Sequence, residues 1–207
     1  MSDYPADYPA DYPADLLART PAPPYDGEGP HALWHYSEDP SLHRFDPRPS
    51  PTGDDEGLLV WAIDTRHAPT FWFPRDCPRL CLWPAASTTP EDRERFFGQS
   101  ALPRIHVFEA GWLDRVRACT LYAYRLPTEP FRPHSVGGYW VAEEAVGAIE
   151  RLAVDDLVGR HGTAGIELRM VPTIWPLAHR VRGSTVAFSG SRLRNASPDP
   201  GPAAVGA

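Results

Sequence analysis

Residues 33–45 are Leu-Trp-His-Tyr-Ser-Glu-Asp-Pro-Ser-Leu-His-Arg-Phe, and this stretch begins the part of the chain that can fold. Its first four residues, Leu33 to Tyr36, are apolar and aromatic enough to predict a short strand. The Ser-Glu-Asp-Pro segment predicts a turn, because Ser and Asp side chains bond the local backbone and Pro fixes φ. The stretch also holds the densest group of side chains capable of chemistry, so a candidate site is sought here first.

The residues before this stretch predict a disordered arm. The tetrapeptide Asp-Tyr-Pro-Ala occurs three times between Asp3 and Ala14, and such a period suits neither a helix nor a sheet. We expect residues 1–30 to be a disordered repeat arm, residues 31–195 a single domain, and residues 196–207 a disordered tail. A docking motif with the repeated Tyr residues as anchors is the alternative interpretation of the arm.

Beyond the turn, the sequence predicts many strands separated by short helices. The apolar run 58–63 fits a strand buried on both faces, and it ends at Asp64 and Thr65, either of which could cap a helical turn. Thr89, Pro90 and Gly98 predict the cap, first residue and end of a helix. Other expected strands are 80–83, 104–109, 120–126, 138–141, 166–171 and 186–188, and other expected helices are 111–117, 153–160 and 175–182. Few intervals can hold a regular crossover helix, which predicts an α+β fold with a mixed, largely antiparallel sheet and short irregular helices.

Composition argues against several classes of function. The net charge of −7 and the pI near 5.6 give no general attraction to nucleic acid or anionic membranes. No apolar run approaches the roughly 20 residues needed to cross a bilayer, and the amino terminus lacks the pattern of a secretory signal. The three Cys residues fit reduced thiols. We therefore expect a cytoplasmic protein without membrane association, and the oligomeric state stays open.

Several blocks of sequence resemble an uncharacterised bacterial family of unknown function, over about Leu33 to Asn195. The blocks are Leu-Trp-His-Tyr-Ser at 33–37, Val-Trp-Ala-Ile at 60–63, Phe-Pro-Arg-Asp-Cys-Pro-Arg at 73–79, Tyr-Ala-Tyr-Arg-Leu-Pro at 122–127, Tyr-Trp-Val-Ala-Glu-Glu at 139–144 and Ile-Glu-Leu-Arg at 166–169. More distantly, their order is similar to the ADP-ribosyltransferase-like fold. That resemblance implies a His on the first strand, an aromatic or hydroxyl residue on a middle strand, and a later Glu. His35 matches the first position, Trp61 or Asp64 stands at the second, and Glu143 matches the third.

The resemblance implies a nucleotide site, with no certain cofactor and with NAD as a candidate substrate. His35 would bond a ribose hydroxyl and Glu143 would stabilise an oxocarbenium-like centre, as a carboxylate can beside a developing positive charge. These two are the predicted catalytic residues. The alternative is that His35 is a core-edge histidine bonded to backbone and that Glu143 caps a turn. The predicted ligand-binding residues are Tyr36, Ser37, Trp61, Asp64, Arg75, Arg79 and Tyr139.

Residues 75–79, Arg-Asp-Cys-Pro-Arg, have their own alternatives. The two arginines could clamp a phosphate, or they could form a salt-bridge network with the Asp between them, which is the favoured interpretation. Cys77 lies between two arginines and could be an activated thiol, although no base is near it in the sequence. Cys77, Cys81 and His67 are too loosely spaced to predict zinc, and no metal site is expected.

Two functions from different classes follow from these residues. The first is binding of a nucleotide or ADP-ribose-like small molecule, with transferase or hydrolase chemistry. The second is a non-catalytic ligand-binding or protein-interaction domain on the same sheet. The geometric test between them is whether His35 and Glu143 open into one hollow. A further expectation concerns Gly137 and Gly138, which should permit a tight turn or a close approach of backbone.

Overall fold

The computed structural model describes residues 32–49, 57–100, 102–134 and 137–201. These residues divide into two compact units. The described residues within 32–75 and 119–157 form one, which we call the seven-stranded unit, and those within 76–118 and 158–201 form the other, the four-stranded unit. The predicted arm, residues 1–30, and the end of the predicted tail, residues 202–207, lie outside the described residues.

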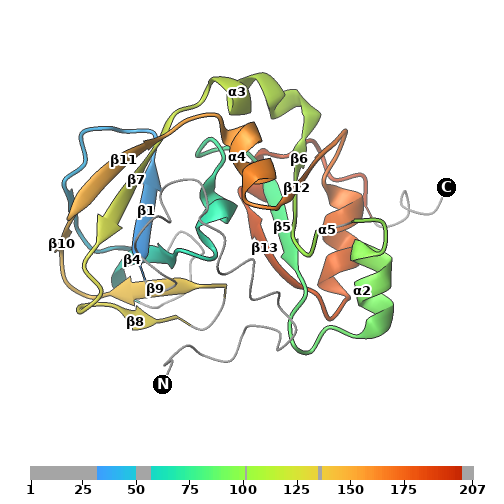
Figure 1. Ribbon diagram of the computed structural model, residues 1–207, viewed down its shortest axis with the longest axis horizontal. Coiled ribbons are helices and arrows are strands. Elements are labelled where there is room, and N and C mark those ends of the chain that lie inside the picture. The colour runs from blue at the N-terminus through green and yellow to red at the C-terminus, as the bar shows by residue number, and fades with distance from the viewer. Residues whose placement is uncertain (1–31, 50–56, 101, 135–136, 202–207) are drawn as a thin grey trace. The chain divides into compact units, whose positions relative to one another are not determined.

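The seven-stranded unit contains a sheet with the strand order β11-β7-β1-β4-β9-β8, and β3 pairs with β4 beside this path. Figure 1 shows β1 lying beside β7. Every described pair in this sheet is antiparallel. The strands are β1 (Leu33–Ser37), β3 (Arg48–Pro49), β4 (Leu58–Asp64), β7 (Leu121–Leu126), β8 (Arg132–Pro133), β9 (Tyr139–Ala142) and β11 (Glu150–Val154).

One face of this sheet packs on a small two-stranded sheet, while Trp34, Ile63 and Val141 of the other face are buried as well. Strand residues alternate between faces, and those of one face pack in a cluster with Phe45 and Val146, which lie on the small paired strands β2 (Arg44–Phe45) and β10 (Val146–Gly147). We call this the core face. Its strand residues include Leu33, Val60, Ala62, Tyr124, Leu126 and Ala142.

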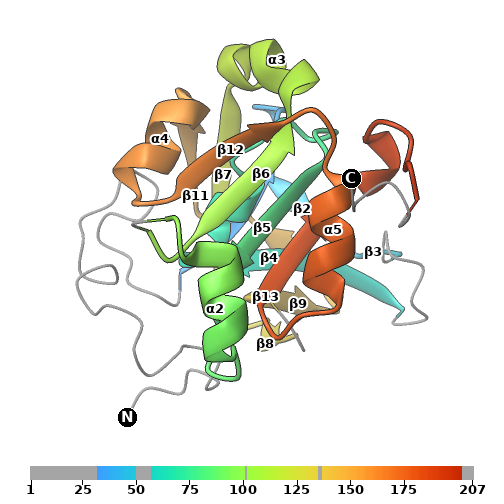
Figure 2. The same cartoon turned by 90° about the vertical axis from the view of Figure 1, so that its right-hand side faces the viewer.

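The four-stranded unit has the strand order β12-β6-β5-β13. Its strands are β5 (Arg79–Trp83), β6 (Ile105–Glu109), β12 (Glu167–Val171) and β13 (Ala187–Ser191). The β12–β6 pair is parallel and the other two are antiparallel. Helices α2 (Pro90–Phe97) and α5 (Trp175–Arg182) cover one face of this sheet, as Figure 2 shows, and bury an apolar cluster against it.

Helix α2 forms as the sequence predicts. The Thr89 side chain accepts a hydrogen bond from the backbone N–H of Asp92 at 3.2 Å, and Pro90 occupies the first helical position, where its missing N–H costs nothing. Gly98 ends the helix, and a Cβ atom there would lie 2.4 Å from the Glu94 carbonyl oxygen. This helix therefore shows a start and a stop that are both encoded locally.

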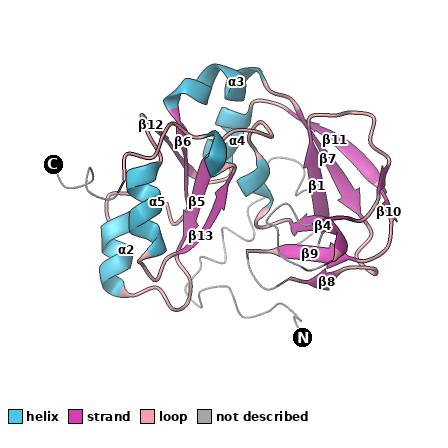
Figure 3. Cartoon of the chain, turned by 180° about the vertical axis from the view of Figure 1, so that it is seen from behind, coloured by secondary structure: helices cyan, strands magenta, loops and turns pink. Residues whose placement is uncertain are grey.

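The remaining helices are short; Figure 3 shows the helices in cyan against the strands in magenta. The seven-stranded unit has the 3-10 turn η1 (Ala68–Phe71), whereas the four-stranded unit has η2 (Ala110–Trp112), α3 (Leu113–Ala118), most of α4 (Leu157–Thr163) and η3 (Leu193–Asn195). The predicted helix over 153–160 is wrong in its first part, because Glu150–Val154 pairs with β7 over five residues as β11. Sheet pairing overrides the weak helical pattern there.

The prediction of an α+β fold with largely antiparallel sheets is confirmed, since β12–β6 is the one parallel pair among the described strands. The ordered chain also continues beyond the predicted boundary at residue 195. Ser197 is held by the carboxylate of Glu109, which accepts its N–H at 2.9 Å and its hydroxyl at 2.7 Å. Within the described residues, no helix combines the length and the apolar character that a bilayer crossing requires.

Candidate functional site

Four half-buried aromatic residues of the seven-stranded unit form a connected group, which we call the aromatic surface: Tyr36, Trp61, Phe71 and Tyr139. The rings of Tyr36 and Phe71 are stacked, with centroids 6.3 Å apart. Tyr139 meets Phe71 edge to face at 6.0 Å and Trp61 edge to face at 5.8 Å. Each of these four residues keeps part of its surface exposed, although the indole nitrogen of Trp61 is buried.

Strand register explains why these rings meet. Trp34 of β1 pairs with Ile63 of β4, and Tyr36 and Trp61 each lie two residues from that pair, on the same face of the sheet. Ile63 in turn pairs with Tyr139 of β9. Paired residues of antiparallel strands project from the same face, and this face is the one opposite the core face. Phe71 is not on a strand of the sheet; it is the last residue of η1. The next residue, Trp72, donates its indole N–H to the Tyr36 hydroxyl at 3.3 Å.

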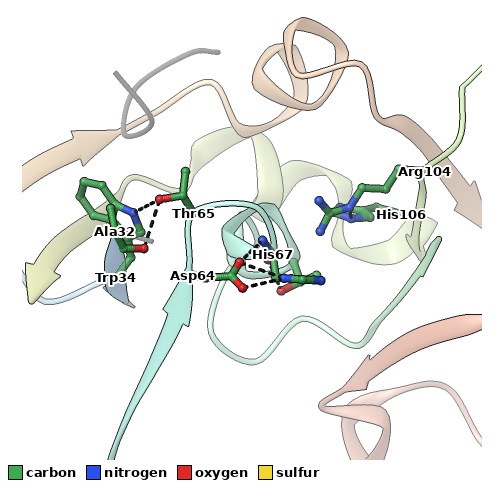
Figure 4. Close-up of polar contacts among 8 residues, drawn as sticks. Ala32, Trp34, Asp64, Thr65, His67, Arg104 and His106 are labelled. Atoms are coloured by element: carbon green, nitrogen blue, oxygen red, sulfur yellow. Dashed lines mark hydrogen bonds and ion pairs between the residues drawn. The ribbon is translucent and has the colours of Figure 1, made fainter. Parts of the chain in front are cut away.

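Asp64 and His67 form a buried pair at the end of β4, drawn in Figure 4. Asp64 is 1% exposed and His67 is 5% exposed. His67 Nδ1 lies 2.8 Å from Asp64 Oδ1 and 3.0 Å from Oδ2, and the His67 backbone N–H donates to Oδ1 at 2.8 Å. An ionised carboxylate only accepts, so Nδ1 carries the proton of the neutral ring. The lone pair is then on Nε2, and an imidazole oriented in this way can accept a proton.

Gly138 packs against this pair. Its φ is +75°, and a Cβ atom there would lie 2.1 Å from His67 Nδ1 and 2.6 Å from Asp64 Oδ2. Its carbonyl also accepts the Asp64 backbone N–H at 2.9 Å. The predicted close approach of backbone is confirmed. Gly138 directly precedes Tyr139 and His67 directly precedes η1, so two short segments join the Asp64–His67 pair to the aromatic surface.

His35 lies on the core face. Its Nδ1 donates to the Trp61 carbonyl oxygen at 3.1 Å, and its ring is 4.6 Å from that of Phe45. Burial lowers the pKa of His35 below its ordinary value, and the charges of Arg75 and Arg48 act in the same direction, against the effect of the Trp61 bond. These contacts are those of the core-edge histidine that the sequence left as the alternative.

Glu143 follows β9, and its side chain is 77% exposed. It forms an ion pair of 3.5 Å with Arg132, whose own side chain is 60% exposed. Arg132 pairs with Val141 in the sheet, and Val141 pairs with Trp61, so this ion pair belongs to the face of the aromatic surface. His35 and Glu143 therefore lie on opposite faces of the sheet, and the fold does not bring the two predicted catalytic residues together.

The other predicted ligand-binding residues have different positions. Ser37 is buried on the core face, and its Oγ accepts the Asp39 backbone N–H at 3.1 Å. Arg75 is exposed, and its backbone N–H donates to Glu38 Oε1 at 2.7 Å. Arg79 belongs to the four-stranded unit, where it is 4% exposed and donates to the Cys77 carbonyl oxygen at 3.2 Å. Of the predicted set, Tyr36, Trp61 and Tyr139 thus form one group.

Neither the thiol chemistry nor the metal chemistry weighed for residues 67–81 gains support from the geometry. Cys77 has no exposed surface, and its Sγ faces the Pro78 carbonyl oxygen at 3.7 Å. Burial raises the pKa of Cys81 to about 12, which keeps that thiol protonated. Within the described residues, no group of three or more His, Cys, Asp or Glu side chains could hold a metal ion.

Sequence reasoning missed Phe71 as a member of the site and considered His67 only as a zinc ligand. The sequence does contain a pattern that predicts the Asp64–His67 contact. Asp64 ends a buried strand and lies three residues before His67, which is the spacing at which an Asp side chain accepts a backbone N–H in a turn. Phe71 has no comparable signal, because its place depends on the path of η1.

These observations define an α+β protein with an aromatic surface and an adjacent buried Asp–His pair on its seven-stranded unit. The chain belongs to a family of unknown function, DUF6886, whose model matches residues 34–196. The predicted resemblance to an uncharacterised family is thereby confirmed. No curated protein matches the chain, and no solved structure matches it.

Proposed function

We propose that the seven-stranded unit binds a nucleotide-like ligand, of the ADP-ribose or NAD class, by stacking its base on the aromatic surface. The observation that carries the proposal is the connected group of four half-buried aromatic residues on the sheet face opposite the core face. Stacking a base on an aromatic side chain contributes about 1–3 kcal/mol. The class of ligand is the one expected from the sequence blocks, whose order we interpreted as similar to the ADP-ribosyltransferase-like fold.

Arg75 supports the choice of a ligand that carries phosphate. The bond from its backbone N–H to Glu38, the residue after β1, holds it at the end of the strand that contributes Tyr36. Trp72, three residues earlier, reaches the Tyr36 hydroxyl itself. Arg75 is an exposed residue, and a guanidinium group offers a planar set of donors suited to phosphate oxygens. A base on the rings and a phosphate near Arg75 is the binding mode that we propose.

Transfer or hydrolysis at the bound ligand forms the catalytic version of the proposal. For it, His67 is a better candidate for proton acceptor than His35, because Asp64 orients its ring and the segment after it leads to Phe71. The separation of His35 from Glu143 favours the second candidate function, a domain that binds the same ligand without acting on it.

A thermal-shift titration with NAD, ADP-ribose and AMP tests the binding proposal. Ligand at 100 times its Kd stabilises a protein by about 2.7 kcal/mol, a rise in Tm of roughly 5–10 °C for a chain of this size. Tyr36→Ala should weaken binding at least about fivefold, since it removes a stacking ring. Tyr122→Ala is the matched control, because Tyr122 is also half-buried but pairs with Ser37 and packs on the core face.

The outcome that contradicts the binding proposal is the absence of any shift with these nucleotides at millimolar concentration. Equal weakening by Tyr36→Ala and Tyr122→Ala would also contradict it, because the face of the sheet would then be irrelevant. Each variant is compared with its own ligand-free Tm, so a change in stability does not mimic a change in binding. Chromatography of NAD and ADP-ribose after incubation then separates the two candidate functions. Turnover that His67→Gln abolishes, with binding retained, identifies the catalytic one.

A further inference from the structure

Two histidines of the four-stranded unit are completely buried and contact each other. His106 lies on β6 and His161 on α4, and both are 0% exposed. His161 Nε2 and His106 Nδ1 are 3.0 Å apart. On the other side of the His106 ring, Arg104 Nε donates to Nε2 at 3.1 Å, as Figure 4 shows. The three side chains form a continuous hydrogen-bonded chain from the sheet to the helix.

The donors and acceptors in this chain can be arranged in only one way. A guanidinium group has no acceptor, so His106 Nε2 must present a lone pair to Arg104. The single proton of neutral His106 is then on Nδ1 and is donated to His161 Nε2. His161 must accept at Nε2, and its own proton is therefore on Nδ1. The geometry thus assigns both tautomers, and both rings are neutral.

One additional proton breaks the chain wherever it binds. A proton on His106 Nε2 faces the Arg104 N–H, and a proton on His161 Nε2 faces the His106 N–H, so two donors would oppose each other in either case. A change of tautomer at His106 only moves the conflict from one side of its ring to the other. No arrangement of three protons on the two rings satisfies both contacts.

The charged groups around the pair in this unit add to the effect. Arg104, immediately before β6, and Arg79 on β5 are both buried cations, and Cys81, which pairs with His106 across the sheet, is a neutral thiol. On α4 itself, Arg160 precedes His161. Burial first, and then the charges of Arg104, His161 and Arg79, hold the pKa of His106 well below its ordinary value.

Helix α4 depends on this contact more than a longer helix would. It has seven residues and includes Gly159 and Gly162, which weaken a helix by about 1 kcal/mol each relative to Ala. His106 and His161 meet on the face of the sheet opposite α2 and α5. The buried cluster on the α2–α5 side is apolar and contains no histidine, and the buried charged residue beside it is Glu109, which accepts the Ile174 backbone N–H at 3.1 Å. Acid should therefore affect α4 and leave the α2–α5 side intact.

We propose that the His106–His161 contact is an acid-sensitive latch, which holds α4 on β6 while both rings are neutral and opens when either ring gains a proton. Along the chain, α4 follows β11 of the seven-stranded unit and precedes β12 of the four-stranded unit. The latch thus acts at one of the points where the chain passes between the two units, the others in the described residues being 75–76 and 118–119. Histidines of the opened state titrate near the ordinary value of about pH 6.5, so the closed state loses stability progressively as the pH falls below that value.

Hydrogen exchange of the full chain between about pH 7 and pH 5 tests the latch near the histidine pKa. The reporters are the amides of Ala164 and Ile166, which donate to the Arg160 and His161 carbonyl oxygens, and the reference is the amide of Ala178 in α5. Protection factors of the reporters, corrected for intrinsic exchange, should fall by up to about tenfold per pH unit for each proton gained on opening. The reference should not follow them.

Two variants separate the latch from general effects of acid. His161→Gln keeps an acceptor for His106 but cannot titrate, so its reporters should keep constant protection over the same range. His179→Gln changes an exposed histidine of α5 that pairs with Asp199, and it should behave as the wild type does. Constant protection in the wild type, or an equal fall in His161→Gln, overturns the proposal. If His161→Gln does not fold, side-chain nitrogen NMR of the wild type decides, because a proton on His106 Nε2 at neutral pH contradicts the assigned chain.

Discussion

Replacing Gly138 by Ala tests how closely the backbone packs against the Asp64–His67 pair. The new Cβ atom would lie 2.1 Å from His67 Nδ1 and 2.6 Å from Asp64 Oδ2. Both neighbours are buried side chains bonded to each other, so neither can move aside without losing that contact. The glycine also has a φ of +75°, which an L side chain adopts only with strain.

The expected loss in the free energy of unfolding has two parts. The left-handed conformation costs about 1–2 kcal/mol for a residue with a Cβ atom. Displacing His67 then leaves a buried carboxylate short of a hydrogen bond, which costs about 1–3 kcal/mol more. We expect Gly138→Ala to destabilise the protein by about 2–5 kcal/mol in total. Gly57 isolates the first part, since its φ is +80° and a Cβ atom added there would have no other atom within 4 Å.

Urea denaturation followed by circular dichroism measures both variants. Gly57→Ala should lose about 1–2 kcal/mol, and Gly138→Ala should lose at least about 1 kcal/mol more than that. A fall in Tm of roughly 2–4 °C for each kcal/mol should accompany these losses in a chain of this size. Equal losses in the two variants would refute the packing argument, because backbone conformation alone would then account for the effect.

Three further predictions concern other parts of the fold. Thr89→Ala should cost about 1 kcal/mol in urea denaturation, because it removes the cap bond to Asp92, and Thr89→Ser should keep most of that stability. The pKa values of His35 and His106 are lowered by burial, so below about pH 6.5 the unfolded chain binds more protons than the folded chain. The free energy of unfolding should therefore fall as pH decreases, by at most about 1.4 kcal/mol per pH unit for each of the two, and a pH-independent value in urea titrations contradicts this. All three cysteines are buried, so a thiol reagent should label them only in denaturant, and labelling of the native chain would contradict their burial.

The elements predicted well are those with local signals. Thr89 and Gly98 bound α2, and the apolar run from Leu58 makes β4, because caps and continuous burial act within a few residues. The strand Glu150–Val154 lacks such a signal. Its conformation depends on hydrogen bonds to β7, more than twenty residues earlier in the chain, and no pattern within the segment reveals that partner.

The candidate site was predictable in part for the same reason. Tyr36, Trp61 and Tyr139 were each selected from the sequence, and they meet because antiparallel pairing places them on one face. The pairing of His35 with Glu143 was not decidable from the sequence, since it depends on strand register across three strands. Buried polar pairs such as His106 and His161 are harder still, because their residues are separated in sequence and each alone resembles an ordinary histidine.

Two neighbouring residues of β1 show that the sheet face on which a side chain lies decides which residues one ligand can contact. His35 and Tyr36 are adjacent in sequence, yet His35 packs on Phe45 at the core face while Tyr36 stacks on Phe71 at the opposite face. A ligand that reaches Tyr36 cannot also reach the ring of His35 without crossing the sheet. If the aromatic surface binds a nucleotide, candidate polar partners are at the end of β4, in the turn between β4 and η1, and in the segment after η1. Asp64, His67 and Arg75 occupy those positions, which makes their substitution more informative than that of His35.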